Sequence, residues 1–281
     1  IWAVFSYAQI IDEEGNDFTD ESHFYYNIFN QPNRTRFEWL NHFFYKGNCL
    51  CHPSVLARKE CYTDIGTFDT RCAQTGDFNL WIRVCLKHEI YIIPEKLVKF
   101  RVRADEKNAS GNRPDAAIRG YFEYGKILRN YLEIDNVEEF FKIFPISSKY
   151  GDLIEKDLIP FFVAMIALET GTHYPLHPYF AINVLFELLG NNDIADKLDK
   201  RCGFRYIDFI KLTGKHDLFN ITKLAERDRQ LAERDRQLAE QQIINQRMFN
   251  SVSWRITAPL RYVYDHISPV YRYVRGKGSS E

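Results

Sequence analysis

The pattern of hydrophobic and polar positions divides the chain into four zones. In the first, residues 1–105, β-rich runs such as 2–9 alternate with helical stripes. The clearest stripe predicts a helix over 78–88, because apolar residues recur there three and four positions apart. We expect further strands at 48–56 and within 89–101. Helices between short strands are typical of an α/β sheet.

The second zone, residues 106–220, is expected to be all-helical. A polar stretch at 104–115, with Gly and Pro, is typical of a linker or flexible loop. Runs such as DLIPFFVAMIAL and FAINVLFELL then show a spacing of three and four. These runs predict a small α-domain of helical hairpins.

The third zone, residues 221–249, contains a perfect repeat of LAERDRQ. Leu224, Leu231 and Leu238 are spaced seven apart, so a heptad helix that forms a homo-oligomer is one interpretation. If the leucines occupy d positions, however, Asp228 and Asp235 fall at a positions, which makes a poor coiled-coil core. A solvated single helix therefore remains open beside the dimer.

The fourth zone, residues 250–281, is an amphipathic basic and aromatic tail. Apolar residues recur at spacings of three and four from Ile256, among arginines and tyrosines. Such a face can lie on the anionic inner surface of a cell membrane. The alternative is a helix that packs back on the protein.

Composition adds few restrictions. The net charge of −1 over 281 residues gives no global attraction to nucleic acid or membrane. Six cysteines are too few for a disulfide scaffold at this size, so we expect free thiols in a reducing cytoplasm. The N-terminus shows no secretion signal. It opens on IWAVFSYAQI, which resembles the middle of a sheet, and we interpret the chain as a fragment.

One acidic residue lies in a setting that suits proton transfer. Asp77 follows Gly76 and precedes the apolar stripe of the predicted helix, so its carboxylate is expected at a helix N-terminus on the sheet edge. There it can act as a base toward a hydroxyl, or it can only cap the helix. Downstream, Arg101 and Arg103 share one side of a predicted strand, where they can bind phosphate or form surface salt bridges.

A series of short motifs between residues 10 and 103 has a recognisable order and spacing. They are IDEEG (11–15), Gly47-Asn48, Pro53-Ser54, Arg58-Lys59, IGTFD (65–69), GDFNLWIR (76–83), IPEKL (93–97) and Phe100-Arg101. Together they resemble the C-terminal half of a family 2 inverting glycosyltransferase with a GT-A fold, a Rossmann-like mixed sheet. The run SWRITAPLR at 253–261 is similar to a tail that follows coiled coils in bacterial enzymes of this kind.

The resemblance implies roles for particular residues. Asp77 takes the place of the family's catalytic base, although Gly76 and Asn79 stand where relatives often have further acids. Asn48 and Gly76 belong to the substrate pocket in this reading. The resemblance also implies that Arg101 and Arg103 reach the donor diphosphate.

The resemblance also implies ligands. These are a nucleotide-sugar donor and a saccharide or lipid-linked acceptor. We expect no binding of nucleic acid. A divalent metal, Mg²⁺ or Mn²⁺, is implied for the intact enzyme, with its ligands in the N-terminal half and outside this chain. We therefore expect a glycosyltransferase fragment, inactive alone, from bacterial surface polysaccharide synthesis. The alternative is a non-catalytic helical scaffold.

Overall fold

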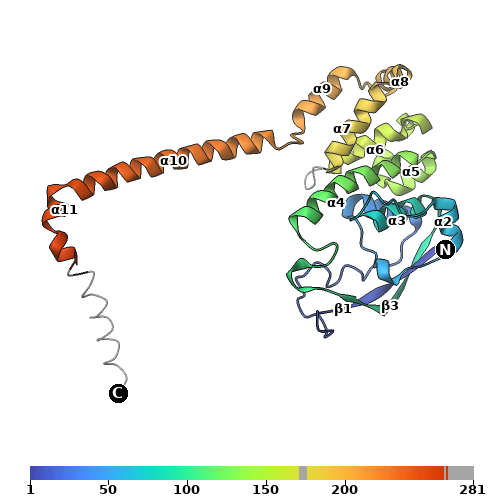
Figure 1. The fold of residues 1–281 in the computed structure, drawn as a ribbon. Helices are drawn as coiled ribbons and strands as arrows, with labels where there is room; N and C mark the ends of the chain where they lie inside the picture. Colours follow the sequence, from blue (N-terminus) through green and yellow to red (C-terminus); the bar gives the residue numbers. More distant parts are fainter. Residues whose placement is uncertain (171–175, 263, 265–281) are drawn as a thin grey trace. The chain divides into compact units, whose positions relative to one another are not determined.

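The computed structural model describes residues 1–170, 176–262 and 264. The chain forms two compact units, Ile1–Leu218 and Phe219–Glu281, and each is described on its own. The strands and α-helices of the first unit are β1 (Ala3–Ile11), α1 (Arg36–Lys46), β2 (Leu56–Ala57), α2 (Lys59–Ile65), α3 (Gly76–Lys87), β3 (Ile90–Arg101), α4 (Pro114–Ile127), α5 (Val137–Ile143), α6 (Ile159–Thr170), α7 (Leu176–Leu189), α8 (Asn192–Cys202) and α9 (Tyr206–Lys215) (Figure 1). Short 3₁₀ turns join them: η1 (His52–Ser54), η2 (Ala104–Glu106), η3 (Leu128–Glu133), η4 (Pro145–Leu153) and η5 (Lys156–Leu158).

The sheet among the described residues has three strands in the order β2-β1-β3. β3 runs parallel to β1 and β2 runs antiparallel to it, so this is a small mixed sheet followed by helices. The register between β1 and β3 shifts after the pair Ser6 and Ile93. Pro94 follows at once, and because it lacks an N–H it cannot continue the ladder.

The predicted strands at 2–9 and within 89–101 are confirmed as β1 and β3. The strand expected over 48–56 is wrong, because only Leu56–Ala57 pairs with β1. Instead, the Asn48 side chain accepts a hydrogen bond from the Leu50 backbone at 3.1 Å, and residues 52–54 form a 3₁₀ turn. Local side-chain bonds of this kind compete with the strand ladder.

The helix α3 confirms the stripe predicted over 78–88. It buries Phe78, Leu80, Trp81 and Cys85, and the Trp81 ring meets Phe5 of β1 edge to face. α3 therefore covers the sheet with its apolar face.

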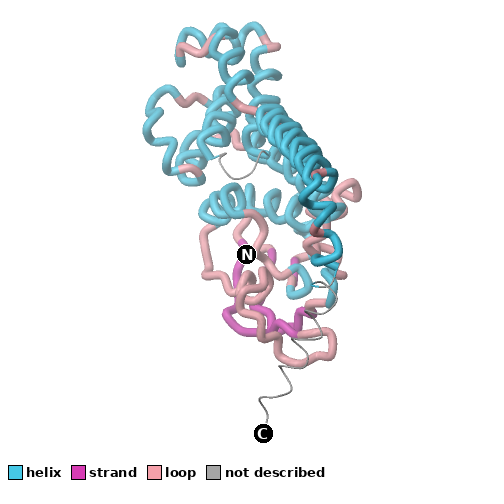
Figure 2. Tube along the Cα trace, turned by 90° about the vertical axis from the view of Figure 1, so that its left-hand side faces the viewer, coloured by secondary structure: helices cyan, strands magenta, loops and turns pink. Residues whose placement is uncertain are grey.

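The helix α1 begins at a capping box, in which Thr35 accepts from Glu38 N while the Glu38 carboxylate accepts from Thr35 N. It buries Phe43 and Phe44 in the same core. Figure 2 shows the strands at one end of this unit and the later helices at the other.

The described residues of 106–218 form only helices and turns, as expected. Their core is continuous with that of the α/β part, because one buried cluster includes Phe5, Phe44, Tyr131 and Phe162. The Tyr131 hydroxyl donates to Leu40 O of α1 at 2.7 Å.

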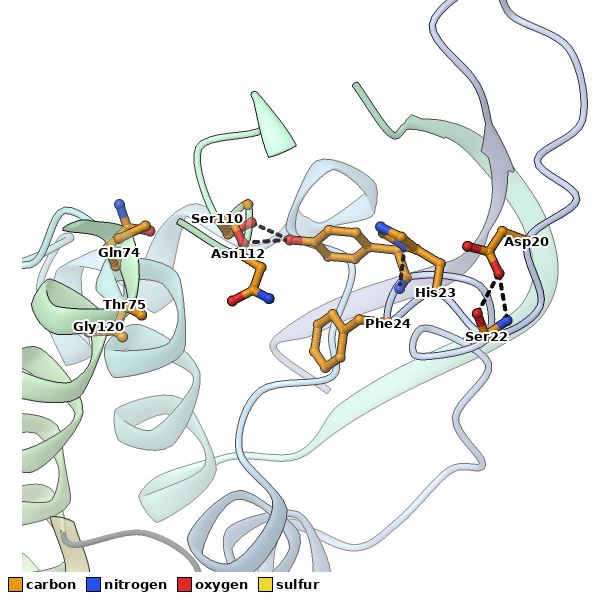
Figure 3. A pocket seen from close by; sticks show the side chains of 13 residues that line it. Asp20, Ser22, His23, Phe24, Gln74, Thr75, Ser110, Asn112 and Gly120 are labelled. Carbon is orange, nitrogen blue, oxygen red and sulfur yellow. Dashed lines mark hydrogen bonds between the residues drawn. The ribbon is translucent and has the colours of Figure 1, made fainter. Parts of the chain in front are cut away.

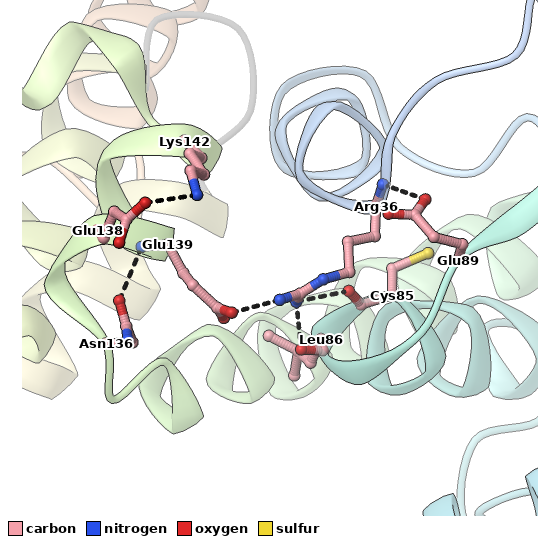
Figure 4. Close-up of polar contacts among 8 residues, drawn as sticks. All are labelled: Arg36, Cys85, Leu86, Glu89, Asn136, Glu138, Glu139 and Lys142. Carbon is pink, nitrogen blue, oxygen red and sulfur yellow. Dashed lines mark hydrogen bonds and ion pairs between the residues drawn. The ribbon is translucent and has the colours of Figure 1, made fainter.

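Arg36 makes a further connection between the two parts (Figure 4). Its guanidinium donates to Leu86 O of α3 at 2.6 Å and pairs with Glu139 of α5. The helical region is thus packed on α1 and α3 as well as joined to them by the chain.

The second unit contains α10 (Ile221–Asn250) and α11 (Val252–Ile256). The helix expected over 221–249 is observed, and none of its residues is buried. The three heptad leucines are all exposed, and pairing with a second copy stays a prediction. In the tail, the described apolar residues Val252, Ile256 and Leu260 are exposed, whereas 263 and 265–281 lie outside the described residues. Within the described part of the chain, no helix has the length and apolar character needed to cross a bilayer.

Candidate functional site

A cavity of about 640 Å³ opens where α3 begins. Asn48, Gly76 and Asp77 all contribute to its wall. The structure therefore places Asn48 beside the adjacent pair Gly76 and Asp77, and these three residues were predicted to share a site. Phe24, Tyr25 and the loop at 108–110 also line this cavity.

Asp77 is the second residue of α3, two positions after the N-cap residue Thr75. Its Oδ1 accepts from Phe78 N at 2.7 Å, and its Oδ2 accepts from Asn48 Nδ2 at 3.4 Å. The carboxylate thus lies in the first turn rather than at the cap position. The helix dipole still stabilises a negative charge in the first turn. A role of Asp77 in stabilising the start of α3 therefore stays open beside the catalytic one.

Burial is the largest influence on the pKa of Asp77, and it raises that pKa above its ordinary value. The hydrogen bond from Phe78, the charge of His52 and the hydrogen bond from Asn48 act in the opposite direction and only partly offset burial. A carboxylate whose charged form is poorly solvated takes up a proton more readily. Burial therefore makes the carboxylate of Asp77 more basic than that of an exposed aspartate.

The turn before Asn48 depends on glycine. Gly47 ends α1 with a φ of +82°, a backbone region that residues with a Cβ rarely adopt. Asn48 then directs its amide toward Asp77. The sequence pair Gly47-Asn48 thus sets the position of one donor to the carboxylate.

Neither Arg101 nor Arg103 is among the residues that line this cavity. Arg101, the last residue of β3, donates from Nη1 to Asp12 O at 3.0 Å and to Glu13 O. Arg103 follows the strand, and its backbone N donates to Asn108 Oδ1 at 2.7 Å. Arg101 therefore holds the turn at 12–15, and contact of either arginine with a diphosphate stays a prediction.

Glu123 of α4 is a site residue that sequence reasoning missed. It is 3% exposed, and its carboxylate accepts from Ala73 N at 2.9 Å, Gln74 N at 2.7 Å and Thr75 N at 2.8 Å. The Thr75 hydroxyl also donates to it, at 3.1 Å. Three successive N–H groups form a nest that suits an anion. Glu123 thereby fixes the loop that leads into Asp77, and no local motif around residue 123 signals this role.

The described residues do not fit a divalent metal. They contain no group of three or more His, Cys, Asp or Glu side chains placed to hold an ion. Asp69 also lines the cavity, but both of its oxygens accept from the Arg71 guanidinium, at 2.9 and 2.8 Å. We therefore derive no step through a metal.

Comparison of the chain with protein-family profiles, with curated proteins and with solved structures gave no match in any of the three.

Proposed function

We propose that residues 1–105 form the acceptor side of an inverting glycosyltransferase with a GT-A fold, and that Asp77 is its general base. The observation that carries the proposal is a half-buried carboxylate with a raised pKa at the wall of a 640 Å³ cavity. A base with that placement can take the proton from an acceptor hydroxyl as its oxygen attacks the anomeric carbon of the donor, while the bond from that carbon to the diphosphate breaks and the nucleoside diphosphate leaves. The motif order from residue 11 to 101 supports the same assignment.

The charges around the cavity favour the acceptor over the donor. Among the described residues, the acidic and imidazole side chains that line it are Asp69, Asp77 and His52, and no Lys or Arg lines it. A diphosphate is normally neutralised by arginine, lysine or a metal. The cavity therefore suits an uncharged polyhydroxyl compound, and the nucleotide-sugar donor belongs to other residues of the enzyme. A saccharide or lipid-linked acceptor in bacterial surface polysaccharide synthesis agrees with this chemistry.

The test is the Asp77→Asn variant of the complete gene product. We expect kcat to fall by roughly 10²–10⁴-fold, the usual contribution of a general base, while donor affinity is unchanged. The matched control is Asp193→Asn, because Asp193 is likewise the second residue of a helix, α8, but is exposed. It reproduces any loss of helix-dipole interaction without touching the cavity. If both variants keep full transfer, Asp77 is not the base.

A second candidate is a non-catalytic scaffold, for which α10 is the supporting observation. No residue of this helix is buried, and its three heptad leucines are all exposed. A scaffold predicts no sugar transfer by the complete gene product under any donor, so the same assay separates the two functions. We also propose that residues 251–281 attach the protein peripherally to a membrane surface.

A further inference from the structure

A second cavity, of about 670 Å³, lies beside the cavity of Asp77. Three segments bound it: the turn at 20–25, the loop residues Gln74 and Thr75, and residues 110–120 at the start of α4. Figure 3 shows Phe24 and Asn112 on one side and Gln74, Thr75 and Gly120 on the other. The two cavities share Phe24, Tyr25, Gln74 and Ser110 as lining residues.

The wall between the cavities is held in place. The Tyr25 hydroxyl hydrogen-bonds to Ser110, with its oxygen 2.5 Å from Ser110 Oγ and 3.2 Å from Ser110 O. The Tyr25 ring itself is buried against Phe100, with centroids 4.9 Å apart. Gln74 follows Ala73 in the loop that Glu123 clamps. The boundary of the second cavity is thus built from fixed groups on both sides.

The lining residues define the kind of ligand. Phe24 is 68% exposed, so an aromatic face is available for stacking, and the C–H face of a sugar ring is attracted to the electron-rich face of such a ring. The Gln74 side-chain amide makes no hydrogen bond among the described residues, and an amide offers both donors and an acceptor to neighbouring hydroxyls. Among the wall residues that the structure describes, Asp20 is the single acidic residue and His23 the single imidazole, and no Lys or Arg is present. This chemistry fits a neutral saccharide and disfavours a phosphate.

We propose that this second cavity is an acceptor subsite for a further sugar unit. It would hold the sugar next to the one whose hydroxyl reaches Asp77, so that the enzyme acts on a disaccharide or longer acceptor. The assignment rests on the glycosyl transfer proposed above. It adds to it the length of the acceptor and two specificity residues, Phe24 and Gln74.

The test measures binding without any donor. The chain is applied to a glycan array that carries mono-, di- and longer saccharides, as wild type and as Phe24→Ala, Gln74→Ala and Asp77→Asn. The matched control is Phe186→Ala, because Phe186 of α7 is 69% exposed and lines neither cavity. We expect wild type to bind longer saccharides better than monosaccharides. Binding of the longer ones should be about tenfold weaker in Phe24→Ala, and also weaker in Gln74→Ala, with Phe186→Ala unchanged.

Absence of wild-type binding to any saccharide overturns the subsite, and so does equal binding by wild type and Phe24→Ala. If Phe24→Ala does not fold, as judged by circular dichroism, Gln74→Ala decides in the same way. The array contains no nucleotide sugar, so its outcome is separate from that of the transfer assay. Full transfer by Asp77→Asn removes the proposed base. A loss in Phe24→Ala and Gln74→Ala that affects the longer saccharides more than the monosaccharides, with Phe186→Ala unchanged, still supports the subsite.

Discussion

Removal of the Glu123 carboxylate tests whether the helical region fixes the loop before Asp77. In Glu123→Ala, the three backbone N–H groups of residues 73–75 and the Thr75 hydroxyl lose their shared acceptor. Each hydrogen bond to a charged group contributes roughly 1.5–3 kcal/mol, but the four bonds share one side chain and are not additive. Gln74 and Thr75 are half-buried, so water replaces part of the loss. We therefore expect the free energy of unfolding to fall by about 3 kcal/mol.

Glu123→Gln should lose less, roughly 1–2 kcal/mol, because its amide keeps one acceptor but turns an NH₂ group toward one of the donors. Urea unfolding followed by tryptophan fluorescence measures both, since Trp39 and Trp81 are fully buried in this unit. The control is Glu133→Ala on η3, an exposed carboxylate whose removal should cost at most about 0.5 kcal/mol. A loss below about 1 kcal/mol in Glu123→Ala would refute the clamp.

Two further predictions follow from burial. Because the pKa of Asp77 is raised in the folded state, wild type loses stability as pH rises from the unfolded pKa through the folded one. Asp77→Asn should therefore be the more stable protein at neutral pH, and the difference in free energy of unfolding should vanish below about pH 4. Urea unfolding of both proteins at a series of pH values measures this difference. A difference that does not depend on pH contradicts the prediction. Burial raises the pKa of Cys49 to about 12 and of Cys51 to about 11. A thiol reagent should accordingly label only the half-buried Cys72 and Cys202 quickly, and rapid labelling of a third thiol in the native protein contradicts the buried positions.

The elements that sequence predicted well are those whose signal is local. The stripe from Phe78 to Leu86 repeats every three to four residues, and the helix α3 buries nearly that whole face. The heptad repeat likewise became α10. In both cases the period of the side chains alone determines which backbone geometry places them on one face.

The strand predicted at 48–56 did not form, and the hydrogen bonds of Asn48 explain why. Its apolar residues suggest a strand, yet the Asn48 side chain bonds to Leu50 N and toward Asp77. Its carboxylate partner is 29 residues away. Whether Asn48 makes local side-chain bonds or joins a strand depends on that distant partner. The pattern of apolar positions along the chain does not reveal such a partner.

The candidate site was predictable only in part. Asn48, Gly76 and Asp77 do meet at one cavity, whereas Arg101 bonds to the carbonyls of a turn 88 and 89 residues earlier. Glu123 lies 48 to 50 residues from the groups that it binds. Contacts at such separations follow from the packing of α4 against the loop, so the sequence around residue 123 shows only a helical carboxylate.

The two carboxylates beside this loop differ in the number of donors around them, and that difference separates their roles. An ionised carboxylate has about four lone-pair positions. Glu123 accepts from four donors, one on Oε1 and three on Oε2, and it is only 3% exposed, so a substrate hydroxyl has no access to it. Asp77 accepts from two, and the bond from Asn48 is long at 3.4 Å, beyond the usual range for N–H···O bonds. Asp77 therefore keeps acceptor capacity at the cavity while burial raises its pKa. The Glu123 carboxylate is enclosed by its donors, whereas that of Asp77 lines a cavity, which is why Asp77 rather than Glu123 is the residue to test for proton transfer.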